Sequence, residues 1–277
     1  MSKSDKKIAV IKVGGDVLLD KQERCGLAEN IKQLRDNNWS IILLHGGGPQ
    51  VNQLQKLHGL KPNKVAGRRI TSEKDLLVVK QAIAGEVNVD LVSELSKLGL
   101  PAFGCHGASA GIIQAVKRPP VLTTGCGDKP IDFGEVGDVT GINSRVLMGL
   151  LELGLIPIVA TLGIDQNGRI FNINADTTVV QIAKAMKANL LLLTTQVGGV
   201  FKGLDDPTSR IKQVDQKQAK QLIADGIIQG GMIPKVEEAM TLLSEGIETI
   251  AIVSGKKDGA FLAVVNGTGE FGTRITG

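Results

Sequence analysis

The 277-residue sequence is poor in aromatic side chains, with no tyrosine, a single tryptophan (Trp39) and six phenylalanines. Proteins that bind single-stranded nucleic acid stack the bases on aromatic rings, so this scarcity argues against such a partner. The charge balance agrees, because 32 Lys and Arg stand against 28 Asp and Glu, for a net charge of only +4. We therefore expect no nucleic-acid partner.

Long apolar runs are also missing. The longest, from Leu153 to Ile164, is shorter than the ~18 residues that a membrane-spanning helix requires, and it contains Pro157. The first ten residues carry positive charge but lack the apolar segment and the cleavage site of a secretion signal. The sequence therefore predicts a cytoplasmic protein with no membrane partner.

Cysteine and histidine are few and scattered. Cys25, Cys105 and Cys126 contain no Cys-x-x-Cys pair, which favours free thiols in a reducing compartment. The three histidines lie far apart in the sequence and have no matched cysteines, so we assign no metal ligand.

Glycine is what the sequence has in excess: 35 residues, or about 13% against a usual ~7%. Short apolar runs such as Ile8–Val13, Ile41–Leu44 and Leu190–Thr194 alternate with helical stretches. This alternation predicts an α/β fold with an open, mainly parallel central sheet sandwiched by helices. The stretch from Ala102 to Val139 predicts short strands and turns, a β-hairpin or lid excursion beside a site. We expect one domain over 1–277, divided into lobes at 1–174 and 175–277.

Two glycine clusters follow predicted strands. In Ile11-Lys12-Val13-Gly14-Gly15 a lysine lies inside a buried strand, which is unfavourable unless its ammonium emerges beside an anion. In His45-Gly46-Gly47-Gly48-Pro49 the glycines open a helix, so several backbone N–H groups and a helix N-terminus converge. Such N–H groups bind phosphate or carboxylate oxygens. A packed role explains His45 better than a catalytic one.

Polar residues of the second half follow the same pattern. Strand alternation places Asn172 and Asn174 on one face, and Asp176 then lies in the first turn of a helix that Asn174 could cap. Lys235 lies in the first turn of a later helix, where the macrodipole disfavours a cation unless an anion lies nearby. Both segments therefore favour binding of a small anionic molecule.

A basic segment lies between these regions. Residues 50–70 contain five Lys and Arg and no acidic side chain, so they can attract an anionic substrate or partner. Within this segment, Arg68-Arg69 is suited to hold a carboxylate through two hydrogen bonds.

Two glycine clusters, two lysines and one carboxylate suit the stabilisation of a highly anionic transition state, as in phosphoryl transfer. An acceptor carboxylate with a pKa near ~4.3 is already ionised at pH 7, so the reaction requires no general base. We therefore expect Asp176 to orient the lysines rather than to abstract a proton.

Five segments in this order, IKVGG, LHGGGPQV, GRRIT, FNINAD and GGMIPKV, resemble the amino-acid kinase family over about residues 7–276. FNINAD and GGMIPKV resemble its members that phosphorylate N-acetylglutamate. The resemblance implies transfer of the ATP γ-phosphoryl group to the side-chain carboxylate of N-acetyl-L-glutamate, an acyl-phosphate product and a place in arginine biosynthesis. It also implies the cofactors ATP and Mg²⁺, the latter held through the nucleotide phosphates.

The resemblance also implies roles for individual residues. Lys12 and Lys235 would bracket the transferring phosphoryl group, and Asp176 would hold both lysines. The residues expected to bind the acceptor substrate are Gly47, Gly48, Arg69 and Asn172. The residues expected to bind the nucleotide are Gly14, Gly15, Gln196, Val197, Gly198, Gly199, Val200, Phe201, Ile227, Ile228 and Gln229. Of these, Gln196 stands where the family usually has an aspartate.

Three alternatives stay open from the sequence. One is a kinase for aminoadipate or glutamate carried on a small acidic protein, which the basic segment could attract. Another is a nucleotide-binding sensor without turnover. A uridylate kinase is the third, and FNINAD and GGMIPKV fit it less well than they fit an N-acetylglutamate-phosphorylating member. Only about seven residues precede the first strand, whereas the hexameric, arginine-inhibited relatives have a longer N-terminal helix, so we expect a homodimer with little arginine feedback.

Overall fold

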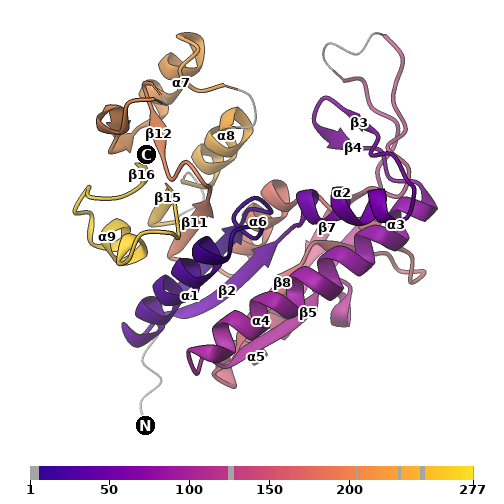
Figure 1. Ribbon diagram of the computed structural model, residues 1–277, viewed down its shortest axis with the longest axis horizontal. Coiled ribbons are helices and arrows are strands. Elements are labelled where there is room, and N and C mark those ends of the chain that lie inside the picture. The colour runs from indigo at the N-terminus through magenta and orange to yellow at the C-terminus, as the bar shows by residue number, and fades with distance from the viewer. Residues whose placement is uncertain (1–5, 124–127, 204, 230–231, 244–246, 277) are drawn as a thin grey trace.

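The structure is a computed structural model that describes residues 6–123, 128–203, 205–229, 232–243 and 247–276 (Figure 1). An eight-stranded sheet runs through it in the order β14-β16-β15-β11-β1-β2-β8-β5. Neighbouring strands are parallel except for β15 and β16. In that order the strands are Gln213–Val214, Thr273–Ile275, Thr249–Val253, Leu190–Thr194, Ile8–Val13, Ser40–His45, Ile156–Ala160 and Ala102–His106.

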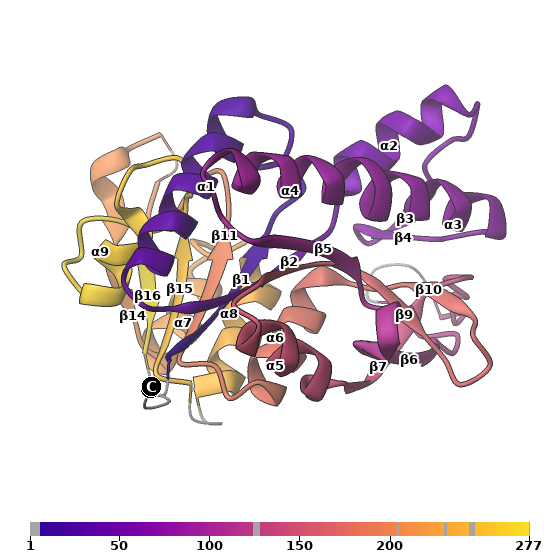
Figure 2. The ribbon, with the colours of Figure 1, turned by 90° about the horizontal axis from the view of Figure 1, so that it is seen from below.

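The central strands are buried along nearly their whole length and are mostly apolar, because helices cover both faces of the sheet. Ile11 of β1 lies between Leu43 of β2 and Leu192 of β11. Figure 2 shows α1, α4 and α9 on one face and α5, α6 and α8 on the other. The helices are α1 Lys21–Asp36, α4 Asn88–Lys97, α5 Ser144–Glu152, α6 Ala175–Ala185, α7 Gln216–Ala224, α8 Met232–Leu243 and α9 Ala260–Asn266.

One long helix changes its pitch in its middle section. It begins as α3 (Glu73–Val79), where Ser72 and Asp75 form a capping box, and it ends as α4. Between them, Lys80–Val87 is a π-helix, which the sequence analysis did not predict. A π-turn changes which residues face the sheet after it, so this segment determines which side chains of α4 point inward.

Part of the expected excursion joins a second sheet. Its four strands, in the order β10-β9-β6-β7, are Ile170–Asn172, Leu162–Ile164, Ile113–Lys117 and Gly137–Ile142. Ala102–His106, expected to belong to the excursion, is instead β5 at the edge of the main sheet, because it pairs with β8. A two-stranded hairpin, β3 (Lys64–Val65) and β4 (Arg68–Arg69), follows α2 (Gly48–Leu57). The remaining short elements are β12 Val200–Phe201, β13 Arg210–Ile211 and the 3₁₀ turns Ser109–Gly111 and Pro207–Ser209.

The strand order creates a ligand-binding position at the centre of the sheet. From β1 the chain adds β2, β8 and β5 on one side, and β11, β15, β16 and β14 on the other. In open α/β sheets, ligands bind at the carboxyl ends of the strands where the order reverses in this way. Within the described ranges, no helix has the length and apolar character needed to cross a membrane.

Candidate active site

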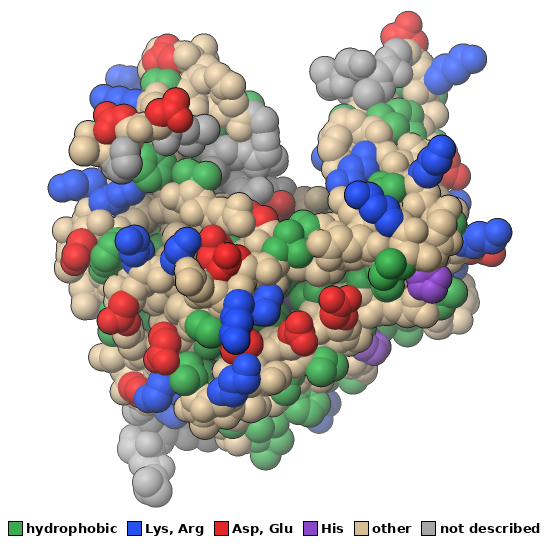
Figure 3. All heavy atoms as spheres, viewed as in Figure 1, with side chains coloured by type: hydrophobic (Ala, Val, Ile, Leu, Met, Phe, Trp, Pro, Cys, Tyr) green, Lys and Arg blue, Asp and Glu red, His purple; other side chains and the backbone are tan. Residues whose placement is uncertain are grey.

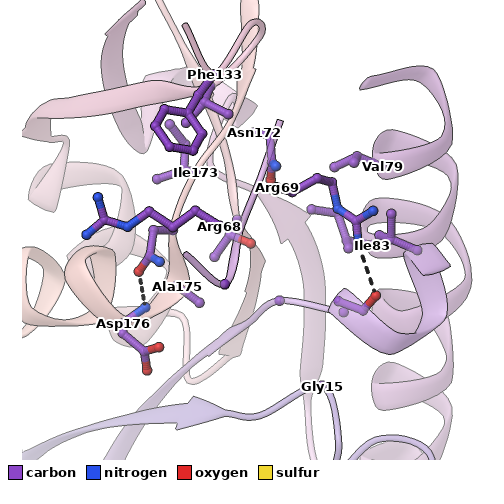
Figure 4. A pocket seen from close by; sticks show the side chains of 18 of the residues that line it. Gly15, Arg68, Arg69, Val79, Ile83, Phe133, Asn172, Ile173, Ala175 and Asp176 are labelled. Atoms are coloured by element: carbon purple, nitrogen blue, oxygen red, sulfur yellow. Dashed lines mark hydrogen bonds between the residues drawn. The ribbon is translucent and has the colours of Figure 1, made fainter. Parts of the chain in front are cut away.

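A cavity of about 300 Å³ lies at the carboxyl ends of β1 and β2 (Figure 4). It is lined by the loops after β1 and β2, the β3–β4 hairpin, the long helix, the excursion and the segment that leads into α6. Figure 3 shows the molecule hollowed between the arm that carries the hairpin and the part that carries α7. Of the seven residues expected to be catalytic or to bind the acceptor, six line this cavity: Lys12, Gly47, Gly48, Arg69, Asn172 and Asp176.

The buried lysine of β1 is paired with a carboxylate. Lys12 is 7% exposed, and its Nζ lies 3.0 Å from Oδ1 of Asp176. Asn174 caps α6 as expected, because its Oδ1 accepts hydrogen bonds from the backbone N–H groups of Asp176 and Thr177. The cap fixes the first turn of α6 and therefore holds the Asp176 carboxylate beside the ammonium. The ion pair offsets the cost of burying the Lys12 charge.

The two glycine loops pack directly on each other. A Cβ at Gly15 would lie 2.8 Å from Cδ of Pro49, and one at Gly47 would lie 2.9 Å from Cγ2 of Ile83. Gln50 links the loops, since its Nε2 donates to the Gly15 carbonyl at 3.1 Å. Only glycine allows these approaches, which bring the backbone N–H groups of both loops to one end of the cavity.

Arg69 is held in place by the helix that follows the second glycine loop. Its guanidinium donates to the side chains of Gln55 and Asn52 and to the Gly48 carbonyl. Burial lowers the pKa of Arg69 from its usual value, although nearby Asp75 opposes this shift. These three contacts leave further N–H groups of the guanidinium for a ligand, since arginine has five.

Arg69 and Asn172 line the same cavity. Asn172 lies in β10, and its Nδ2 donates to Oγ1 of Thr71 at 3.1 Å. In Figure 4 the side chains of Arg68 and Arg69 extend in opposite directions, and Arg69 points toward the Gly48 carbonyl.

Most residues expected to bind the nucleotide lie over the other half of the sheet, whereas Gly14 and Gly15 lie in the loop after β1 and Gly15 lines the cavity. Residues 196–201 follow β11, where Gly198 adopts a φ of +75° and a Cβ would lie 2.7 Å from Cβ of Ser254. Gln196 Nε2 donates to the Asp16 carbonyl at 3.3 Å, so this loop contacts the loop after β1. Ile228 is buried after α7. Lys235 lies in α8, and its side chain is outside the described residues.

Two other groups that could react are deeply buried. His45 has no exposed surface, and burial lowers its pKa to about 4, so it is neutral at pH 7 and packed as expected. Burial raises the pKa of the Cys105 thiol to about 12, which makes it a poor nucleophile. Cys126 is outside the described residues. Among the residues that are described, no group of three or more His, Cys, Asp and Glu is placed to hold a metal ion.

Several residues that line the cavity were not identified from the sequence. Val79 and Ile83 come from the long helix, and Phe133 and Val136 come from the excursion. Arg118 also lines the cavity and pairs with Asp138, with 2.6 Å from Nη2 to Oδ1. The apolar spacing identifies Val79 and Ile83 only as core residues. No local pattern identifies the excursion residues as part of a site, because their position depends on how that segment folds back.

The fold and the site define a class of α/β proteins that bind an anionic small molecule at the switch point of a parallel sheet. Residues 7–254 match the model of the amino acid kinase family, and the chain belongs to that family. The family match extends over both halves of the main sheet.

Similar proteins cover the whole chain. An acetylglutamate kinase of Anaeromyxobacter sp. (strain Fw109-5) is 40% identical over 271 residues, which are 98% of this chain and 100% of the relative. That of Methanocaldococcus jannaschii is 37% identical over 98% of this chain and 90% of the relative. A carbamate kinase structure from Giardia superposes with a TM-score of 0.68 at 17% identity, covering 99% of each chain, which supports the fold alone.

Proposed function

We propose that this protein is an ATP-dependent acetylglutamate kinase, which transfers the γ-phosphoryl group of ATP to the side-chain carboxylate of N-acetyl-L-glutamate. The reaction gives an acyl phosphate for arginine biosynthesis. The observation that carries the proposal is the Lys12–Asp176 pair in a cavity that also presents Arg69 and two glycine loops. The full-length similarity to acetylglutamate kinases supports the substrate.

In this proposal Lys12 contacts the transferring phosphoryl group from the acceptor side, and Lys235 contacts it from the nucleotide side. Asp176 orients Lys12 and takes no proton, because the acceptor carboxylate is already ionised at neutral pH. The N–H groups of Gly15, Gly47 and Gly48 would donate to phosphoryl and carboxylate oxygens, whereas that of Gly14 donates to Oγ1 of Thr194 at 3.4 Å. Catalysis then rests on positioning and on neutralising charge in the transition state.

The acceptor would lie lengthwise in the cavity. Arg69 and Asn172 would hold the carboxylate that does not react, at the end of the cavity opposite the transferring group. The apolar side chains of Val79, Ile83 and Phe133 line the same space and would cover the carbon chain of the substrate. This arrangement would place the reacting carboxylate at the glycine loops.

The nucleotide would bind to the lobe of 175–277, along 196–201 and 227–229, with residues 1–174 as the acceptor lobe. Mg²⁺ would bind through the nucleotide phosphates and water, a common mode for this ion, which fits a described site with one carboxylate already paired to a lysine. When bound, Mg²⁺ neutralises phosphate charge during transfer.

We also propose a cytoplasmic homodimer. The strand β5 forms an edge of the main sheet, so the backbone N–H and C=O groups on its outer side have no partner strand in the described part of that sheet. A second copy of the chain could pack against this edge and shield these groups. Phe103 on this strand is 41% exposed and Val89 on the neighbouring α4 is 63% exposed, which supports an apolar contact there. Sedimentation at several concentrations would measure the oligomeric state.

The direct test is ATP-dependent hydroxamate formation in the presence of hydroxylamine, which traps acyl phosphates. N-acetylglutamate is compared with glutamate, aspartate and free aminoadipate. Product with N-acetylglutamate alone would support both reaction and substrate. Product with glutamate or aspartate at comparable rates would contradict the proposed specificity.

A second candidate, a kinase for aminoadipate or glutamate carried on a small acidic protein, is favoured by one observation. Lys56, Lys61, Lys64 and Arg68 are all exposed, Arg68 also lines the cavity, and Figure 3 shows Lys and Arg side chains gathered over this arm. This candidate would be favoured if none of the four free acceptors gave a hydroxamate and the phosphoryl group were transferred only to a carrier-bound acceptor. ATP binding without any turnover would instead favour a sensor.

A further inference from the structure

His45 and Asn88 form a buried polar contact next to the glycine loop after β2, which lines the cavity. His45 is the last residue of β2 and has no exposed surface, and Asn88 is the first residue of α4 and is 5% exposed. The two side chains meet at 2.9 Å, from Asn88 Nδ2 to His45 Nε2. Buried polar groups of this kind restrict the structure to one arrangement, because each must find a partner.

The partners of Asn88 determine which nitrogen of His45 carries the proton. Asn88 Nδ2 also lies 2.9 Å from the Ile158 carbonyl and 3.1 Å from the Cys105 carbonyl, which can only accept. An amide nitrogen cannot accept a hydrogen bond, so His45 Nε2 is the acceptor, and the two N–H groups of Nδ2 are shared among it and the two carbonyls. In the neutral imidazole the proton is then on Nδ1, which lies 2.8 Å from the Gly46 carbonyl and donates to it.

This hydrogen bond fixes the peptide that joins Gly46 to Gly47. The peptide is trans, so its carbonyl and its N–H point in opposite directions. With the Gly46 carbonyl turned toward the buried imidazole, the Gly47 N–H is directed away from it. Gly46, Gly47 and Gly48 all line the cavity.

The π-helix explains how one continuous helix contacts both Gly47 and His45. Ile83 and Val87 of the π-helix pack against Gly47, and Asn88 contacts His45. In a regular α-helix, Ile83 and Asn88 would lie about 140° apart around the axis, five residues at 3.6 per turn. The i→i+5 pitch of a π-helix brings such residues toward one face.

We infer that His45 and Asn88 are positioning residues for the phosphoryl-transfer reaction: through the Gly46 carbonyl they aim the Gly47 N–H at the reacting carboxylate. The inference rests on the proposed function. Neither side chain touches substrate, and neither exchanges a proton with it. Their contribution is to hold one donor of the transition state in place before the substrate arrives.

Substitutions of His45 separate its two hydrogen bonds. His45→Asn keeps a donor near the position of Nδ1 and loses the contact with Asn88, whereas His45→Gln keeps an acceptor near Nε2 and loses the bond to Gly46. We expect kcat with N-acetylglutamate to fall roughly 10²-fold in His45→Gln and to stay within about tenfold of the wild type in His45→Asn. The KM for MgATP should not change in either variant.

A purely structural role would lower the unfolding temperature of both variants and would not separate their kcat values. The control is His58→Gln, which changes an exposed histidine at the end of α2 and should leave kcat unchanged. Equal kcat in His45→Gln and His45→Asn, with both folded, would overturn the inference while leaving the proposed function intact. A wild-type protein without turnover would overturn the proposed function, and this inference with it.

Discussion

The Lys12 ammonium lies 3.0 Å from the Asp176 carboxylate, so the end of β1 and the first turn of α6 are joined by one ion pair. Its members are 164 positions apart in the chain, yet both line the acceptor cavity. The pair holds a positive charge at the point where a buried strand ends. The proposed chemistry depends on this placement.

Removal of the Lys12 charge tests the role of that residue in the transition state. Lys12→Met keeps the length of the side chain, and kcat should fall by roughly 10²–10³-fold because one charged donor to the phosphoryl group is lost. Steady-state kinetics with N-acetylglutamate would measure this change. Lys7→Met, just before the same strand and paired with Glu248 at the surface, is the control and should keep wild-type kcat. A near-normal kcat in Lys12→Met would refute the assignment.

The ion pair should also contribute to the free energy of unfolding. Asp176→Asn leaves the Lys12 charge without its carboxylate and should lower the free energy of unfolding by about 1–3 kcal/mol. That is less than the roughly 3–5 kcal/mol of a fully buried pair, because the Asp176 side chain is 26% exposed. Adding Lys12→Met should recover most of the loss, since a neutral pair needs no counter-charge. Urea unfolding of the four proteins gives the coupling, and additive losses would contradict it.

Arg69 should act on acceptor binding rather than on the chemical step. Arg69→Lys removes the planar set of donors that Gln55, Asn52 and Gly48 hold in place, so the KM for N-acetylglutamate should rise about 10–100-fold. The KM for MgATP should stay the same. Lys64→Gln changes the exposed cross-strand neighbour of Arg69 and serves as the control. An equal rise in both KM values would indicate general damage instead.

The buried His45 predicts a particular dependence on pH. Burial lowers its pKa from 6.5 to about 4, so the unfolded chain binds the proton more readily than the folded one. The stability that comes from this difference is fully present above pH 6.5 and is lost as the pH falls toward 4. Unfolding from pH 7.5 to 4 should therefore show a stronger loss in the wild type than in His45→Asn. Parallel curves would contradict the lowered pKa.

Much of the fold could be predicted from the sequence because its signals are local. The bounds expected for the strands Ile8–Val13 and Leu190–Thr194 are those of β1 and β11, since a buried parallel strand is an apolar run. The capping box at Ser72 and the cap at Asn174 were likewise predictable, because each involves residues two or three apart. The expected α/β class is confirmed.

What the sequence could not provide depends on contacts between distant segments. The π-helix has no local sequence pattern that separates it from a regular helix. It is favoured by long-range contacts, because its side chains pack on Gly47 and the following Asn88 contacts His45. Arg118 and Phe133 line the cavity because the part of the excursion after β5 folds back into a second, four-stranded sheet. The candidate residues Lys12, Arg69 and Asp176 came from motifs, but their common cavity is a property of the topology.

The most direct test of the central claim is ³¹P NMR of the wild-type protein with MgATP and N-acetylglutamate. The account predicts an acyl-phosphate resonance that grows in step with ADP and is strongly reduced with Lys12→Met. Release of inorganic phosphate from ATP without any acyl-phosphate resonance would contradict it, as would a resonance that Lys12→Met leaves unchanged.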